Sequence, residues 1–125
     1  MDIVNRNDVK AFITKDTSEI REILAPRNSV IKRQSLAEAR VASGRSIEEH
    51  YHIQTEEIYY VLQGNGCMII DGEKQDVKTL DGIAIPPGAR HKIINTGDDD
   101  LVFLCCCTPA YENDDTVITE QYQVL

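Results

Sequence analysis

The sequence predicts an all-β fold, a sandwich or a barrel, and three observations support this prediction. Short runs rich in Val, Ile and Tyr alternate with turn residues, and no long helical pattern separates them. The chain has 125 residues, a length that one hydrophobic core commonly serves. It is 42% hydrophobic, so it can bury such a core without disulfides or a structural zinc. We therefore expect residues 1–125 to form a single domain.

Ten runs have the composition of strands. They are Ser18–Leu24, Ser35–Ala42, Glu48–Ile53, Glu57–Leu62, Gly66–Ile70, Gln75–Leu80, Gly82–Ile85, His91–Asn95, Leu101–Cys107 and Thr116–Thr119. Asp71-Gly72 is the strongest hairpin signal between them, because a type I′ turn needs positive φ at both central residues. Helical signals are weak: Asn7–Phe12 could form a single turn capped by Asn7, and Ser18–Leu24 could be helical instead of extended.

The charge balance restricts the possible partners. The chain has 13 Lys and Arg against 21 Asp and Glu, a formal charge of −8. Such a surface repels nucleic-acid phosphates and anionic lipid headgroups. No apolar run approaches the roughly 20 residues that span a bilayer, and the polar, acidic N-terminus does not resemble a secretory signal. We expect a cytoplasmic protein with neither nucleic-acid nor membrane partners.

The four cysteines are Cys67 and the run Cys105-Cys106-Cys107. They show neither the spacing of a disulfide framework nor two Cys-x-x-Cys zinc pairs. The run could be a soft metal site or a redox pair of adjacent thiols. We favour a buried strand in which these cysteines act as small hydrophobic residues, because free cysteine is among the most buried residue types.

The chain contains three histidines, and their positions suggest a metal site. His50 and His52 are two residues apart, so on a strand both imidazoles point to one face and form a chelating pair. Glu57 follows five residues after His52, which would place it on the opposite face of a continuous strand. A bend over residues 54–56 would shift the alternation of side chains by one residue, and Glu57 would then point to the same place as the two histidines.

His91 would then arrive from a distant strand, positioned by the rigid turn Pro86-Pro87-Gly88. A lone histidine is usually structural, and an exposed His-x-His can simply be a solvated strand. Three imidazole nitrogens and one carboxylate, if they converge, suit Mn, Fe, Co, Ni or Zn far better than Ca or Mg.

The register of these residues resembles the cupin superfamily. Its first motif runs Gly, five residues, His-x-His, three or four residues, Glu, six residues, Gly. This chain has Gly44, His50, His52, Glu57 and Gly64 at matching spacings.

The second cupin motif runs Gly, five residues, Pro-x-Gly, two residues, His, three residues, Asn. Pro86, Gly88, His91 and Asn95 match it, whereas Leu80 stands where the first glycine is expected. Gly82 lies two residues later and could supply the local flexibility, so the departure affects only the turn that enters this strand.

The resemblance implies a double-stranded β-helix, the jelly-roll barrel of cupins, with its motif core over residues 44–95. It also implies a homodimer, in which residues 1–34 and 108–125 provide dimer or edge strands. Ile20–Leu24 or Thr116–Leu125 could be the exchanged edge, since an open sheet edge otherwise invites nonspecific pairing.

The resemblance further implies which residues bind the metal, a divalent Mn, Fe, Ni, Co or Zn ion. The ligand set carried over is His50, His52, Glu57 and His91. Glu56 competes with Glu57, because the family also tolerates three intervening residues, but only Glu57 leaves six residues before Gly64. Each ligand histidine should donate its other ring N–H to a partner that the sequence does not identify.

Strand alternation extends the predicted site. Tyr59 and Val61 should face the same way as Glu57, and Tyr60 the opposite way. Ile93 should point inward and Arg90 outward. Tyr59 is the candidate catalytic residue, as a hydrogen-bond donor or proton carrier, although an aromatic side chain packed in the barrel is the simpler interpretation.

Two arginines, Arg21 and Arg40, are candidates for binding an acidic substrate, although each is more simply interpreted as a surface charge. Glu48 shares the face of His50 and would lie near the barrel mouth. The resemblance favours a metalloenzyme acting on a small polar organic molecule such as an organic acid, sugar acid or phenol, of dioxygenase, isomerase or lyase type. The alternative is a noncatalytic cupin that binds a metal or small ligand, with a structural or sensory metal.

Overall fold

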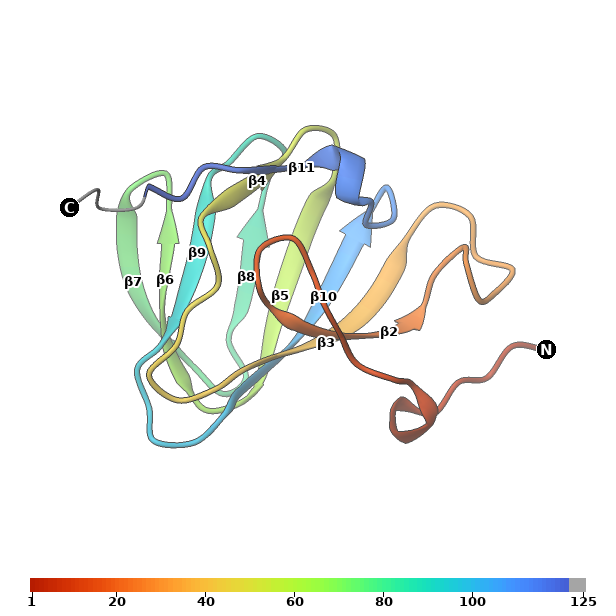
Figure 1. The fold of residues 1–125 in the computed structure, drawn as a ribbon, viewed down its shortest axis with the longest axis horizontal. Coiled ribbons are helices and arrows are strands. Elements are labelled where there is room, and N and C mark those ends of the chain that lie inside the picture. The colour runs from red at the N-terminus through yellow and green to blue at the C-terminus, as the bar shows by residue number, and fades with distance from the viewer. Residues whose placement is uncertain (122–125) are drawn as a thin grey trace.

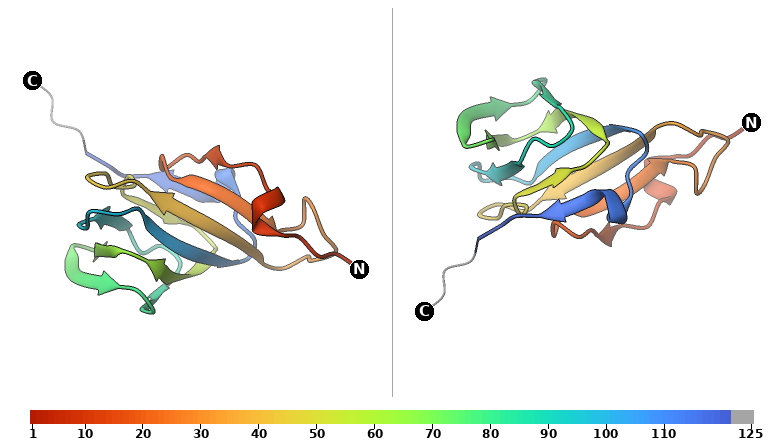
Figure 2. Two further views of the ribbon diagram at one scale, coloured as in Figure 1. Left: turned by 90° about the horizontal axis from the view of Figure 1, so that it is seen from below. Right: turned by 90° about the horizontal axis from the view of Figure 1, so that it is seen from above.

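A computed structural model describes residues 1–121, which fold into two antiparallel sheets facing each other (Figures 1 and 2). The larger sheet has six strands. In spatial order they are β1 (Phe12–Ile13), β2 (Glu19–Leu24), β3 (Ser35–Val41), β10 (Leu101–Thr108), β5 (Glu56–Gln63) and β8 (Gly82–Ile85).

The smaller sheet has five strands. In spatial order they are β11 (Thr116–Ile118), β4 (His50–His52), β9 (His91–Asn95), β6 (Asn65–Ile70) and β7 (Glu73–Lys78). Sequence neighbours β4 and β5 lie in opposite sheets, as do β9 and β10, so the chain passes repeatedly between the layers. This is the jelly-roll barrel that the sequence predicts.

The core fills the space between the sheets. Val61, Ile93 and Leu101 are fully buried, and Phe103 and Tyr59 pack against each other with ring centroids 4.5 Å apart. Because side chains alternate along each strand, these residues form the inner layer of both sheets.

Most predicted strands are present with small changes at their ends, and Ser18–Leu24 is a strand from Glu19, not a helix. The short strand β1 was not predicted. The prediction of a helical turn over Asn7–Phe12 capped by Asn7 is wrong: a 3₁₀ turn covers Arg6–Asp8, and the Asn5 side chain caps it by accepting from the Asn7 N–H. A second 3₁₀ turn, Asn113–Asp115, precedes β11. In residues 1–121 no helix is long and apolar enough to cross a membrane.

Leu80, which replaces a motif glycine, adopts the left-handed backbone conformation with φ +78°. Its N–H donates to the carbonyl of Val61 at 2.8 Å, so the turn keeps a glycine-like geometry despite the leucine side chain. Gly82 is not among the positive-φ glycines, and the turn therefore does not use it to compensate.

The two strands expected to exchange between subunits are paired within the chain. β2 lies between β1 and β3, and β11 pairs with β4, beside which it runs in Figure 1. The predicted C-terminal edge Thr116–Leu125 extends past the described residues, because 122–125 lie outside them.

Candidate metal centre

Four side chains converge between the two sheets. His50 and His52 come from β4 and His91 from β9, where it is the direct cross-strand partner of His50. Glu57 reaches them from β5 in the opposite sheet. The ligand atoms of all four lie within 4.8 Å of one another, and all four side chains are buried. Glu56, the competing carboxylate, is exposed on the other face of β5.

The bend between β4 and β5 gives Glu57 its direction. The carboxylate of Asp115 accepts the backbone N–H groups of Gln54 and Thr55 at 2.9 and 3.1 Å, and the Thr55 hydroxyl donates to the carbonyl of Pro109. These bonds hold the chain out of strand geometry before β5 starts. The bend therefore shifts the alternation of inward and outward side chains by one residue, as expected, and the side chain of Glu57 points inward.

Backbone carbonyls determine the tautomer of two histidines. Nδ1 of His50 lies 2.8 Å from the carbonyl oxygen of Glu48, and Nδ1 of His91 lies 2.9 Å from that of Ala89. A carbonyl only accepts, so each Nδ1 carries a proton, and in the neutral ring Nε2 presents its lone pair to the centre. Burial lowers the pKa of His50 and so favours that neutral ring.

Thr116 fixes the third histidine in the same way. Its hydroxyl donates to the carbonyl of Glu112 at 3.0 Å, and this bond uses its only proton. The oxygen must then accept from Nδ1 of His52, 3.1 Å away, which leaves Nε2 of His52 unprotonated. Each of the three histidines thus has a partner for its Nδ1–H, and all three direct an Nε2 lone pair inward, as metal-binding histidines do.

Glu57 completes the set of donors. Its Oε1 lies 3.3 Å from Nε2 of both His52 and His91, yet Oε1 and the Nε2 of His91 are buried atoms without a hydrogen bond. Buried, unpaired acceptor atoms are costly. A divalent transition metal ion fits this set of nitrogen and oxygen donors and would satisfy them.

The cysteine run lies in a strand as predicted, with two of its three thiols buried, and one of these contacts the cluster. Cys105 and Cys107 face the interior and Cys106 the outside, and burial raises the pKa of all three thiols, which keeps them protonated. The thiol of Cys107 donates to Oε2 of Glu57 at 3.2 Å. Sequence alternation alone did not indicate this contact.

The predicted facing of the neighbouring residues is confirmed. Tyr59, Val61 and Ile93 are buried, whereas Tyr60 and Arg90 are exposed. Burial, with the charge of Glu57 close by, raises the pKa of Tyr59 well above its ordinary value, so this phenol stays protonated. Its ring packs against Phe103.

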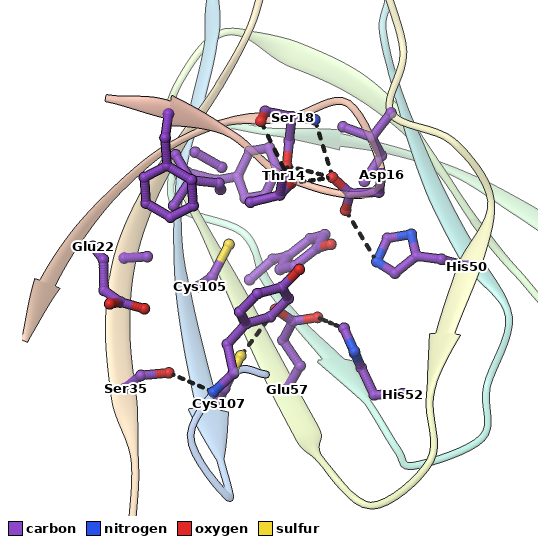
Figure 3. A pocket seen from close by; sticks show the side chains of 18 residues that line it. Thr14, Asp16, Ser18, Glu22, Ser35, His50, His52, Glu57, Cys105 and Cys107 are labelled. Carbon is purple, nitrogen blue, oxygen red and sulfur yellow. Dashed lines mark hydrogen bonds and ion pairs between the residues drawn. The ribbon is translucent and has the colours of Figure 1, made fainter. Parts of the chain in front are cut away.

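A cavity opens onto the cluster from the side of the N-terminal strands (Figure 3). Its lining residues are Phe12, Thr14, Asp16, Ser18, Ile20, Glu22, Ser35, Ala37, Ala39, Ile47, His50, His52, Glu57, Tyr59, Phe103, Cys105, Cys107 and Tyr111. None of these 18 residues is Lys or Arg.

The arginines proposed to bind an acidic substrate lie elsewhere. Arg40 pairs with Asp100 at 2.7 Å, and Arg21 lies 3.9 Å from Glu19, so both are surface charges. Glu48 is likewise absent from the cavity lining and contributes its backbone carbonyl to His50.

Two lining residues did not emerge from the sequence. Asp16, in the turn before β2, places Oδ2 3.2 Å from Nε2 of His50. Tyr111 follows β10, and its ring lies edge-on to His52 with centroids 5.9 Å apart. Burial raises the pKa of Tyr111 to about 12. The sequence signal that could have drawn attention to Asp16 is the Asp16-x-Ser18 pair, which is typical of a turn capped by a side chain.

Comparison with known proteins is consistent with this fold. Residues 37–107 match the model of the cupin domain family. The match covers more than half of the chain, so the protein belongs to the cupin family.

Three relatives illustrate the similarity. An uncharacterised protein of Methanocaldococcus jannaschii is 49% identical over 112 residues, which cover 90% of each chain. The polyketide synthase protein CurC of Streptomyces cyaneus is 31% identical over 86 residues, 69% of this chain and 56% of CurC. A crystal structure of a predicted oxalate decarboxylase from Thermotoga maritima superposes with a TM-score of 0.77 at 26% identity, covering 86% of this chain and 99% of that one.

Proposed function

We propose that this cupin is a metalloenzyme that holds a divalent transition metal on His50, His52, Glu57 and His91 and acts on a small organic molecule. The observation that carries the proposal is the convergence of three Nε2 lone pairs on a buried carboxylate whose Oε1 has no hydrogen bond. A metal bound there can polarise a substrate oxygen, lower the pKa of bound water or activate dioxygen.

The cavity wall supports a catalytic rather than a closed structural site. His50, His52 and Glu57 all form part of that wall, so a small molecule entering the cavity reaches the donors directly. Tyr59 lines the same cavity as a protonated phenol, positioned to donate a hydrogen bond but not to act as a base.

The side chains of the cavity wall also favour one class of substrate. Apart from the cluster, its charged residues are two acids, Asp16 and Glu22, and the remaining wall is largely apolar. A dianion such as oxalate would find no cationic side chain in this wall and would be repelled by the carboxylate of Asp16. We therefore propose an uncharged, partly apolar substrate with carbonyl or hydroxyl oxygens. Such a molecule is closer to the polyketide chemistry named for CurC than to oxalate.

The second candidate is a noncatalytic cupin in which the metal is structural or sensory. Four protein ligands can close a structural site, and this cluster has four candidates. In that case metal removal should unfold the chain, whereas an enzyme of this fold should stay folded around its apolar core.

Metal analysis of protein purified without a His tag tests the proposal, together with melting temperatures in the presence of Mn, Fe, Co, Ni or Zn. We expect bound metal, and a melting temperature that rises with at least one of these ions. Iron, manganese or nickel would direct the search to dioxygen chemistry, and zinc to isomerase or lyase chemistry. Absence of bound metal together with an unchanged melting temperature for every ion would refute the proposal.

Two neighbouring glutamates provide matched variants. Glu57→Gln should abolish metal binding, whereas Glu56→Gln, on the exposed face of the same strand, should leave it intact. His50→Ala combined with His91→Ala should also abolish binding while the metal-free chain remains folded. Collapse of the fold instead would favour the structural role.

We also propose a homodimer, through the outer face of the larger sheet. Cross-strand pairing aligns an outward row of apolar side chains, Leu36, Cys106, Ile58 and Ala84, across β3, β10, β5 and β8. Ile58 is 53% exposed, and Tyr60 on the same face is 38% exposed. A second copy would cover this apolar row. Sedimentation should give about twice the chain mass of 14.1 kDa. The variant Ile58→Lys should sediment with the mass of a single chain.

We propose the cytoplasm as its location. The cysteines are free throughout the described residues, which is in keeping with a reducing compartment.

A further inference from the structure

Asp16 is held in one orientation at the cavity wall. Its Oδ1 accepts three hydrogen bonds, from the hydroxyls of Thr14 and Ser18 at 2.6 Å each and from the Ser18 N–H at 3.0 Å. These donors leave Oδ2 to point away from the turn toward Nε2 of His50, 3.2 Å distant (Figure 3). The residue is only 8% exposed.

The turn that carries Asp16 is itself fixed. Thr17 adopts φ +73°, a strained conformation that is rare for a β-branched residue. Hydrogen bonds from Thr17 N–H to Thr14 O and from Thr14 N–H to Ser18 O, both 3.0 Å, enforce it. The Glu48 N–H also donates to the Asp16 carbonyl at 2.8 Å, tying the turn to the segment that leads into His50. Strain of this kind clusters at functional sites.

Asp16 contacts His50 at Nε2, the nitrogen that would bind the metal. His50 donates its Nδ1–H to Glu48, so the neutral ring turns a lone pair toward the carboxylate of Asp16. Two acceptors 3.2 Å apart need a shared donor or a nearby cation. A metal on His50 Nε2 would supply the cation. Asp16 itself lies outside the group of four residues whose donor atoms are all within 4.8 Å.

The other acid in the wall does not share this position. Glu22 accepts hydrogen bonds from Arg27 at 2.9 and 2.7 Å, which neutralise its charge. Among the described residues, no Lys or Arg forms an ion pair with Asp16. Oδ2 of Asp16 is therefore an acceptor without a cationic side chain, on the wall of the cavity that opens onto the cluster.

We propose that Asp16 is a substrate-binding residue that accepts a hydrogen bond from a hydroxyl or N–H group of the molecule bound at the metal centre. This inference rests on the proposed function and deepens it. It defines the preferred ligands as uncharged molecules, or chelating groups, that carry a hydrogen-bond donor beside the metal-binding oxygen. Anions without a donor are disfavoured by repulsion from the same carboxylate.

Matched metal-binding probes test the proposal on the cobalt-loaded full-length chain. Acetohydroxamate carries an N–H beside its chelating oxygens, and N-methylacetohydroxamate lacks it. Binding of each is followed by the visible absorption of Co(II), in the wild type and in Asp16→Asn. Asn keeps the shape and can keep the Thr14 and Ser18 bonds on its amide oxygen, while its NH₂ replaces the acceptor Oδ2.

We expect the wild type to prefer acetohydroxamate by about tenfold, the scale of one hydrogen bond to a charged group. In Asp16→Asn this preference should shrink to about twofold or less, and the affinity for oxalate should rise by about tenfold because a carboxylate has been removed. An equal preference for acetohydroxamate in both proteins would overturn the proposal. If Asp16→Asn lost as much cobalt affinity as His50→Ala, Asp16 would be a metal ligand and the proposal would also be overturned. Absence of cobalt binding in the wild type would instead refute the metal site itself.

Ser18→Ala provides an independent variant if Asp16→Asn fails to fold. It removes one hydroxyl donor to Oδ1 and loosens the carboxylate without changing its charge. The preference for acetohydroxamate should fall to about threefold, while the affinity for oxalate stays at the wild-type value because the charge is retained. An undiminished preference would contradict the role of Asp16 orientation.

Discussion

Thr116→Val should weaken metal binding without changing any candidate ligand. Valine has nearly the shape of threonine, and Thr116 is 2% exposed, so the packing is preserved and the hydroxyl alone is lost. That hydroxyl is the acceptor for Nδ1 of His52 at 3.1 Å. Without it the ring of His52 loses the contact that fixes both its tautomer and its orientation.

The magnitude follows from the partners of the hydroxyl. Loss of such a partner typically lowers metal affinity 10–100-fold, about 1.4–2.8 kcal/mol. The metal-free protein should also lose stability, by about 1–3 kcal/mol, because the buried Nδ1–H of His52 is left without an acceptor. The carbonyl of Glu112, to which the hydroxyl donates, belongs to an exposed residue and can bond to water instead.

Two assays on the metal-free chain and one control variant test this reasoning. Competition with a chromophoric chelator gives the metal affinity, and denaturant unfolding gives the free energy of unfolding. Thr116→Ser keeps the hydroxyl and loses one methyl group, so it should retain the affinity and cost about 0.8 kcal/mol of stability. If Thr116→Ser lost as much affinity as Thr116→Val, the effect would come from packing and the argument from the tautomer would be wrong.

Two further predictions concern Glu57 and the motif glycine Gly64. Cys107→Ala removes the thiol that donates to Glu57 and should weaken metal binding severalfold, whereas Cys107→Ser keeps a donor and should bind more nearly like the wild type in the same chelator assay. Gly64→Ala should destabilise the fold by about 2–4 kcal/mol, because it combines the left-handed penalty with backbone overpacking: φ is +92° and a Cβ would lie 2.9 Å from the Asp100 carbonyl. Gly72→Ala is the control: φ is +83°, but no atom lies within 4 Å of the added Cβ, so it should cost only about 1–2 kcal/mol of unfolding free energy. Equal losses of stability in the two variants would contradict the steric argument for Gly64.

Local patterns predicted the parts of the site that depend on chain geometry within a strand. The two-residue period places His50 and His52 on one face and turns Tyr59 and Val61 inward, whatever the rest of the fold does. The choice of Glu57 over Glu56 also rested on spacing along the chain, and the structure brings Glu57 into the cluster and leaves Glu56 exposed.

Contacts between distant segments were not predictable in this way. Thr116 is 64 residues from His52, and Asp16 is 34 residues from His50, so no local period relates them. Thr116 reaches its histidine only because β11 pairs with β4 in one register. Leu80 shows the converse: tertiary hydrogen bonding imposes φ +78° on a residue whose type would not have predicted it.

The candidate ligands and much of the cavity wall come from different parts of the chain. The motif core, residues 44–95, supplies all four candidate ligands, so its spacing predicts metal chemistry. Much of the cavity wall comes from outside that core: Asp16 from the turn before β2, Ser35 from β3, and Cys105 and Cys107 from β10. Chains with the same motif spacing can therefore differ in the residues of the cavity wall, since function belongs to the site and not to the fold. For this chain, the wall without cations and with an oriented Asp16 is a better guide to the substrate than the cupin motifs are.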